Sequence, residues 1–229
     1  MSTSMTTLML HSIPQYFPSK GSNNNHFKTI EAVSNMPTDY FRLLIVAPSG
    51  SGKTNLLMHL LFKPLIYYDK IVLYAKNLEQ HYYREMIRRF EKIAEKLGVD
   101  IDELLEVSNQ EVRDIDDVTN TGQKVVIFDD YICSQQDQSS IAKYFIGGRH
   151  KKVSVIYLSQ SYFRIPKDCR LNCNFYIVYD FPSKKERDLV SSELQVPKEK
   201  LALATRDPYS FLYVNLPEKK IFKCFDQEI

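Results

Sequence analysis

One stretch of this chain combines residue types and a spacing that bind phosphate. It consists of Ala47, Pro48, Ser49, Gly50, Ser51, Gly52, Lys53 and Thr54, with Asn55 as the next residue. An apolar run precedes it and a helical pattern follows it, so the backbone N–H groups of the glycine-rich turn can converge on an anion at a helix N-terminus. Lys53 can reach the β- and γ-phosphates of a nucleotide, and the Thr54 hydroxyl can ligate Mg²⁺. The stretch therefore predicts a P-loop, the Walker A motif, although Ala47 stands where the usual pattern has glycine.

Two acids follow another apolar run, Val125 to Phe128, in the pattern of the second NTPase motif, Walker B. Asp129 is placed to ligate Mg²⁺, and Asp130 is placed to orient or deprotonate the attacking water. The alternative is a strand that ends in a solvated turn of two acids. The P-loop upstream favours the functional interpretation, so the pair predicts hydrolysis of the bound nucleotide.

Gln160 follows a further apolar run, 153–158. Its side-chain amide can donate a hydrogen bond to a phosphate and accept one from water at the same time. Gln160 is therefore a candidate sensor of the γ-phosphate, with a buried structural glutamine as the alternative.

Arg149 and Arg170 are the candidate cations for stabilising the transition state. Arg149 lies in a basic loop, 147–152, at the start of a predicted strand and so on the sheet edge away from its own nucleotide. It is badly placed to act within its own subunit and well placed to act on a neighbour. We expect a ring in which Arg149 reaches the ATP of the next subunit, and an ordinary solvated basic loop is the alternative.

The elements that must position these residues alternate between strand and helix. Continuously apolar strands are predicted over 41–46, 70–74, 124–128, 153–158 and 175–179. Helices are predicted after the P-loop and over 78–97, 136–146 and 183–194, with a short helix or turn over 100–107 and a hairpin from 210–214 and 220–225. Such strands predict a parallel sheet that is covered on both faces, and ligands of such sheets lie at the carboxyl ends of the strands.

The order of the motifs refines the fold class. A whole strand–helix unit separates the P-loop from Asp129, as in P-loop proteins that have an extra strand between the two motif strands. We therefore predict an α/β fold of the RecA-like (ASCE) P-loop NTPase class. Its central sheet should be mostly parallel, with helices on both faces and a C-terminal β-hairpin.

Length and charge limit the other possibilities. The chain has 229 residues and a formal charge of +2, so any contact with nucleic acid must come from a local patch. Residues 1–40 are rich in serine, threonine and asparagine and predict a polar extension, which leaves 41–229 as the ATPase domain. No apolar run is long enough to predict a membrane-spanning segment.

Three blocks together resemble a known family. They are the P-loop 47–54, the run Val126 to Asp130, and Gly148 to Asn172, which contains Arg149, Gln160 and Arg170. Over about 41–180 the chain is similar to the poxvirus- and virophage-type genome-packaging ATPases of the FtsK–HerA P-loop superfamily. The third block is the most specific, because generic P-loop proteins lack it.

The resemblance implies an ATPase, with ATP and Mg²⁺ as cofactors, that forms a homo-oligomeric ring and drives double-stranded DNA into a capsid. It implies contact with a procapsid vertex and a location in the viral factory of the host cytoplasm or in the virion. It also implies phosphate binding by Lys53, Mg²⁺ coordination by Thr54 and Asp129, catalysis by Asp130 and sensing by Gln160. The arginine finger would be Arg149 or Arg170. Many members of the superfamily have glutamate where this chain has Asp130.

Two further interpretations compete with a motor. A nucleotide or nucleoside kinase would need an acceptor pocket and would not need the third block, and an assembly scaffold would bind nucleotide without depending on hydrolysis. A basic stripe of Arg84, Arg88, Lys92 and Lys96 on the predicted 78–97 helix is a candidate DNA contact. Acids lie between these residues, so a solvated, ion-paired face is the alternative.

Overall fold

The computed structural model describes residues 35–37, 40–63, 65–118, 122–131 and 135–229. The polar extension predicted over 1–40 lies outside the described residues, apart from 35–37 and 40. The domain boundary at residue 40 therefore stays a prediction.

Nine strands of the described chain form one sheet, in the order β3-β2-β4-β5-β1-β6-β7-β8-β9. They are β1 Arg42–Val46, β2 Lys70–Ala75, β3 Leu105–Ser108, β4 Lys124–Asp129, β5 Val153–Ser159, β6 Phe175–Val178, β7 Leu212–Asn215, β8 Lys220–Lys223 and β9 Gln227–Glu228. Pairing is parallel from β3 to β6 and antiparallel from β6 to β9. The predicted α/β fold, with a mostly parallel sheet and a C-terminal hairpin of β7 and β8, is confirmed.

The strand order also confirms the extra strand between the two motif strands. β5 lies between β1, which leads into the P-loop, and β4, which ends in Asp129. Val46 pairs with Ser159, and Asp129 pairs with Leu158. The ends of β1, β4 and β5 are therefore level with one another, which brings the P-loop, the two acids and Gln160 to one edge of the sheet.

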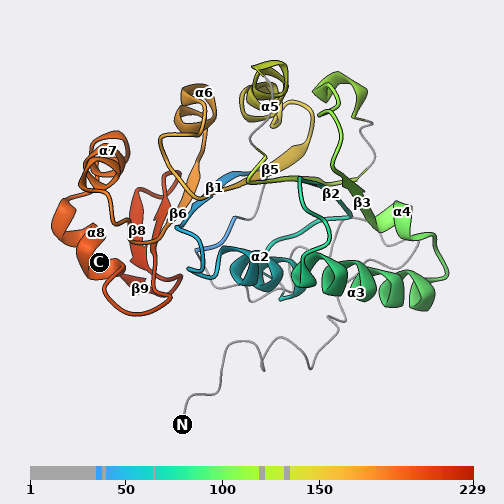
Figure 1. Cartoon of the computed structure of the whole chain (residues 1–229), viewed down its shortest axis with the longest axis horizontal. Coiled ribbons are helices and arrows are strands. Elements are labelled where there is room, and N and C mark those ends of the chain that lie inside the picture. The colour runs from blue at the N-terminus through green and yellow to red at the C-terminus, as the bar shows by residue number, and fades with distance from the viewer. Residues whose placement is uncertain (1–34, 38–39, 64, 119–121, 132–134) are drawn as a thin grey trace, which may run out of the picture.

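Helices cover both faces of the sheet, with α2 and α3 on one side and α5, α6 and α7 on the other (Figure 1). Their bounds are α2 Lys53–Phe62, α3 His81–Leu97, α4 Ile101–Leu104, α5 Gln135–Gly147, α6 Lys167–Leu171, α7 Lys184–Leu194 and α8 Lys198–Ala204. Neighbouring residues of β1 enter opposite layers, because Ile45 packs with the α2 and α3 core and Val46 with the α5 to α8 core. No helix of the described part is both long enough and apolar enough to cross a membrane.

The long helix α3 forms as its spacing predicts. Its buried residues, Tyr83, Met86, Phe90, Ile93 and Ala94, recur at helical intervals and face the sheet. The helix ends at Gly98, whose φ of 64° is the left-handed conformation typical of a glycine C-cap.

The structure departs from the prediction over 100–107. Only 101–104 are helical, as α4, and 105–108 form the edge strand β3, which pairs in parallel with β2. Only the first residue of β3, Leu105, is buried, so the segment lacks the apolar run that marks the central strands. Its strand conformation comes from long-range pairing, which local periodicity does not report. The short helices α6 and α8 also fall where no helix is predicted.

Candidate nucleotide-binding site

A cleft of about 630 Å³ lies at the carboxyl ends of the parallel strands. Five P-loop residues line it together with the adjacent Asn55: Ser49, Gly50, Gly52, Lys53 and Thr54. Asp129, Asp130 and Gln160 line the same cleft. Of the residues that the sequence assigns to nucleotide binding, Ala47, Pro48 and Ser51 do not line it. The structure thus brings the predicted phosphate, metal and water residues into one cavity.

Glycine is required at two places in the P-loop. Gly50 has a φ of 78° and Gly52 a φ of 92°, both in the left-handed region that side chains rarely adopt. Gly52 is the residue before α2, and no side chain caps the backbone N–H groups of the first turn of that helix. Those N–H groups are suited to bind an anion, because the helix dipole favours negative charge at that point.

Ala47 is compatible with this turn. Its side chain is fully buried at the end of β1, and its N–H donates to the Ser159 carbonyl at 3.1 Å. It therefore continues the pairing of β1 with β5 and starts the turn outside the cleft. The missing glycine at this position leaves the cavity unchanged.

Asp129 is a buried carboxylate at the end of β4. The hydroxyl of Tyr83, from α3, donates a hydrogen bond to Asp129 Oδ2. Burial raises the pKa of Asp129 to about 7, the charge of Asp130 adds to the rise, and the Lys53 ammonium opposes it. A buried carboxylate beside a second acid can gain from a bound cation.

Asp130 is linked to two other candidate catalytic groups, Gln160 and Lys53. Its Oδ1 accepts from the Gln160 backbone N–H at 3.0 Å, and its Oδ2 accepts from Gln160 Nε2 at 2.6 Å. Lys53 Nζ lies 3.7 Å from the same Oδ2, and the Lys53 side chain is buried. Asp130 has a φ of 44°, a strained conformation for a residue with a side chain. The strain lets consecutive acids face different partners, Asp129 toward Tyr83 and Asp130 toward Gln160.

The predicted arginine candidates lie in different surroundings. Arg149 is exposed in the loop between α5 and β5, at the amino edge of the sheet and away from the cleft of its own chain. Arg170 lies on α6, where Nε and Nη2 each donate to Glu193 at 2.9 Å and Nη1 donates to the Ile165 carbonyl at 2.7 Å. Its guanidinium also lies over the ring of Tyr162. The structure does not bring either arginine to the cleft.

Sequence reasoning missed several residues that line the cleft. Tyr83 belongs to the apolar stripe of α3, and nothing in its spacing indicates that its hydroxyl meets Asp129. Tyr209, which lies far along the chain between α8 and β7, reaches the P-loop from the other side. Gln80 and Tyr82 come from the start of α3. The positions of Tyr83 and Tyr209 depend on long-range contacts, so no local signal indicates them, whereas Gln80 and Tyr82 follow the carboxyl end of the predicted strand 70–74, which is a signal for this edge of the sheet.

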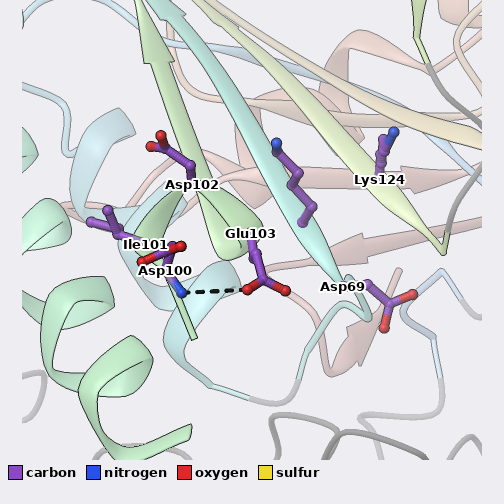
Figure 2. Close-up of a pocket in the computed structure, with 7 residues that line it drawn as sticks. Asp69, Asp100, Ile101, Asp102, Glu103 and Lys124 are labelled. Carbon is purple, nitrogen blue, oxygen red and sulfur yellow. Dashed lines mark hydrogen bonds between the residues drawn. The ribbon is translucent and has the colours of Figure 1, made fainter. Parts of the chain in front are cut away.

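A second hollow, of about 590 Å³, lies at the amino ends of β2 and β4 (Figure 2). Three of its four acids bind backbone N–H groups: Asp69 accepts from Gln123 N at 2.6 Å, and Asp100 and Glu103 form a reciprocal cap at the start of α4. Lys124 is buried there, and burial together with the charges of Lys70 and Arg113 lowers its pKa. These contacts complete the fold of the turns that surround the hollow.

Comparison with known proteins agrees with the motifs. The model of the family described as Poxvirus A32 protein matches residues 28–206. No curated protein matches the sequence at a significant level. The family match confirms the resemblance to poxvirus-type packaging ATPases.

Several solved structures share the fold. The DNA-packaging ATPase B204 of Sulfolobus turreted icosahedral virus is 17% identical, with a TM-score of 0.58 over 81% of this chain and 96% of that one. The genome packaging NTPase B204 of Sulfolobus turreted icosahedral virus 2, in complex with AMP, is 15% identical, with a TM-score of 0.57 over 80% of this chain and 95% of that one. VirB4 of Thermoanaerobacter pseudethanolicus is 10% identical, with a TM-score of 0.52 over 76% and 86%. At these identities the likeness concerns the fold.

Proposed function

The chain belongs to the Poxvirus A32 protein family, and from that premise we propose that it hydrolyses ATP to ADP and phosphate to drive double-stranded DNA into a viral capsid. The observation that carries the proposal is the convergence of Lys53, Asp129 and the Asp130–Gln160 pair in one cleft. A protein that only binds nucleotide has no need of a carboxylate linked to both a phosphate-binding lysine and an amide. We expect it to act in the viral factory or the virion, at a procapsid vertex.

The donors of the cleft suit Mg²⁺. Thr54 offers a hydroxyl and Asp129 a buried carboxylate, and oxygen ligands are those that Mg²⁺ prefers. The fit is supported by the surroundings of Asp129, since burial disfavours its charge and a cation would relieve that cost. When bound with ATP, Mg²⁺ would neutralise charge on the β- and γ-phosphates.

Each side chain of the cleft then has a separate role in hydrolysis. Lys53 binds the phosphates, and in doing so moves its positive charge away from Asp130. Asp130 orients the attacking water and accepts its proton. Gln160 is bonded to Asp130 through both its backbone and its side-chain amide, so it can turn that amide toward a γ-phosphate and keep Asp130 in position. Sensing of nucleotide and activation of water are thereby coupled.

We assign the arginine finger to Arg149, acting on the next subunit of a ring. Arg149 is exposed and carries its charge at the surface, where a neighbouring cleft can meet it. Arg170 already donates to both oxygens of Glu193 and to a backbone carbonyl, so its release would leave a partly buried acid without its partner. A role in fixing α6 to α7 suits Arg170 better.

DNA contact would be weak and independent of sequence, as a translocating motor needs. On α3, Arg88 pairs with Glu85 at 2.8 Å and Arg84 donates to the Glu79 carbonyl. Lys92 and Lys96 are exposed and form no ion pair with a described residue, so we propose this end of α3 as one phosphate contact. The small net charge keeps such contacts easy to break.

ATP hydrolysis measured with and without double-stranded DNA, on protein whose mass is determined in the same buffer, tests the proposal. We expect ADP formation with water as the only acceptor, stimulation by DNA of any sequence that fades with added salt, and an oligomer. Lys53→Ala is the control for contaminating ATPases and should be inactive. Hydrolysis that needs another phosphate acceptor would favour a kinase, and binding without hydrolysis would favour a scaffold.

A further inference from the structure

Tyr209 is an exposed aromatic residue beside the P-loop. It lies in the loop between α8 and β7, lines the cleft and is 63% exposed. Its ring atom Cδ1 is 3.5 Å from the point where a Cβ on Gly52 would stand, so the ring lies next to the P-loop glycine. The ring therefore lines the same cleft as the phosphate-binding residues.

The backbone at Tyr209 is one that glycine would normally adopt. Asp207, Pro208, Tyr209 and Ser210 form a turn that is closed by a hydrogen bond from Ser210 N to the Asp207 carbonyl at 3.0 Å. Proline is favoured at the second position of such a turn, and a positive φ at the third position calls for glycine. Tyr209 has a φ of 63° there. A bulky residue in this region is an outlier, and such outliers concentrate at functional sites.

The surroundings hold this strained turn in place. The Ser210 hydroxyl donates to the Asp207 carbonyl at 2.7 Å and accepts from Asp207 N at 3.1 Å, while the Asp207 carboxylate pairs with Lys223 of β8. The Tyr209 side chain itself contributes little to the fold. It is exposed, and its ring packs against no other aromatic ring of the described chain. Packing therefore does not explain why a tyrosine stands where glycine fits better.

The topology separates two ends of the cleft. Asp130 and Gln160 follow β4 and β5, which lie on one side of the P-loop strand β1. Tyr209 precedes β7, which lies beyond β6 on the other side of β1. A nucleotide with its γ-phosphate toward Asp130 and its phosphates on the P-loop therefore directs its base toward Tyr209.

We propose that Tyr209 is the stacking platform for the nucleobase of the bound nucleotide. The proposal rests on the function proposed above, since it takes the P-loop as the phosphate site. Aromatic stacking tolerates every base because each base has a π-face. We therefore expect similar affinities for ATP and GTP, with the phosphates and not the base supplying selectivity.

Binding of MgATP and of Mg²⁺-tripolyphosphate, which has no base, tests the proposal when measured by calorimetry on the full chain. Tyr209→Gly removes the ring and relieves the turn. Base stacking on an aromatic residue is worth enough for a loss on the order of tenfold in ATP affinity. Tripolyphosphate affinity should stay within about twofold, and Tyr209→Phe should bind ATP like the wild type.

The matched control is Lys219→Gly. Lys219 is exposed, has a φ of 56° and lies in the β7–β8 turn, so the change relieves similar backbone strain without altering the cleft. If Tyr209→Gly loosens the turn, as judged by thermal melting, Tyr209→Asn repeats the test with a residue that tolerates positive φ. Unchanged ATP affinity in the Tyr209 variants, or an equal loss of tripolyphosphate, would overturn the platform. Failure of the wild type to bind either ligand would instead overturn the proposed function.

Discussion

The two edges of the sheet carry hollows of similar size, and both are lined by acids and lysines, yet only one resembles a reaction site. At the amino edge, the acids Asp69, Asp100 and Glu103 bind backbone N–H groups and complete turns. At the carboxyl edge, Asp129 and Asp130 face the side chains of Tyr83, Lys53 and Gln160, which come from distant segments. These side-chain partners can move when a ligand arrives, while the Gln160 backbone N–H still holds Asp130 Oδ1. At the amino edge the one side-chain donor to these acids that the described chain shows, the Tyr67 hydroxyl on Asp69, comes from two residues away.

The burial of the carboxylates separates the edges further. The carboxyl edge contains an acid whose pKa rises to about 7, together with left-handed backbone at Gly50, Gly52 and Asp130. At the amino edge, Asp100, Asp102 and Glu103 are exposed to solvent, where water screens their charge. A cluster of acids in a hollow is therefore a poor indicator of function. A buried acid that lies beside a second acid and a lysine is a better one.

The largest predicted effect concerns Arg149, which lies at the amino edge. If Arg149 acts on the neighbouring subunit, the amino edge also has a catalytic role, and the contrast between the two edges no longer holds. Arg149→Ala should lower kcat by about 10³- to 10⁵-fold, the range for loss of an arginine finger. Lys151→Ala is the matched control in the same loop, where Lys151 pairs with Asp116 at 2.7 Å, and should change kcat less than about twofold. Steady-state ATP hydrolysis measures both.

Mixing distinguishes action between subunits from a role within one. Rings that combine Arg149→Ala with Lys53→Ala subunits contain interfaces where an intact cleft meets an intact finger. Activity should therefore return on mixing two inactive variants. If no ratio restores hydrolysis while the subunits still assemble, Arg149 does not act on its neighbour.

The same substitution at the two edges sharpens the comparison. Asp130→Asn should lower kcat by about 10²- to 10⁴-fold, the usual worth of a general base, and should leave ATP binding in place. Asp102→Asn, at the exposed rim of the amino-edge hollow, should leave kcat within about twofold. Single-turnover hydrolysis together with ATP titration separates chemistry from binding. Equal losses at the two positions would contradict the contrast between the edges.

Asp129 makes the stability of the empty protein depend on pH. Its pKa is about 7 in the folded chain against an ordinary value of 3.8, so the folded state binds the proton more tightly. The stability that this proton supplies is complete below the ordinary pKa and is lost as pH rises through about 7. Between the two pKa values the free energy of unfolding falls by about 1.4 kcal/mol per pH unit, and the fall is on the order of 4 kcal/mol in all.

Asp129→Asn removes the charge at almost constant shape. In buffer with EDTA and no nucleotide, its melting temperature should exceed that of the wild type by a margin that grows from about pH 4 to about pH 7 and then levels off. Differential scanning calorimetry across that range measures the margin, and Asp102→Asn should show no such trend. A constant difference at every pH would mean that the charge of Asp129 is not the cause.

Sequence reasoning succeeded where chemistry is local and failed where partners are distant. Short sequence spacings indicate the P-loop, the acids after β4 and the alternating strands and helices. The position of the site at the carboxyl edge of the sheet could therefore be predicted. The strand β3 could not, because its conformation depends on pairing with β2. Tyr83 and Tyr209 could not be predicted as site residues for the same reason. In the sequence Tyr83 resembles a core residue and Tyr209 a surface residue, and only the fold brings each to the cleft.

Substitution of Tyr83 gives the smallest predicted effect, and it tests whether the side-chain contact to Asp129 supports metal binding. The hydroxyl of Tyr83 donates to Asp129, so it orients the proposed metal ligand through a hydrogen bond. Loss of such a supporting hydrogen bond typically costs 10- to 100-fold in metal affinity. Tyr83→Phe should therefore raise the Mg²⁺ concentration for half-maximal hydrolysis by about tenfold, with kcat at saturating Mg²⁺ much less affected.

Tyr68→Phe is the matched control. Tyr68 is also buried in the α2 and α3 core, and its hydroxyl donates to the Leu61 carbonyl at 2.6 Å, away from Asp129. Both variants lose one buried hydrogen bond, so both should unfold more easily by about 1 kcal/mol. Only Tyr83→Phe should change the Mg²⁺ dependence. If the two variants shift the Mg²⁺ dependence equally, the hydroxyl of Tyr83 stabilises the fold and does not support the metal site. The contact between Tyr83 and Asp129 would then have the same structural role as the backbone contacts of the acids at the amino edge.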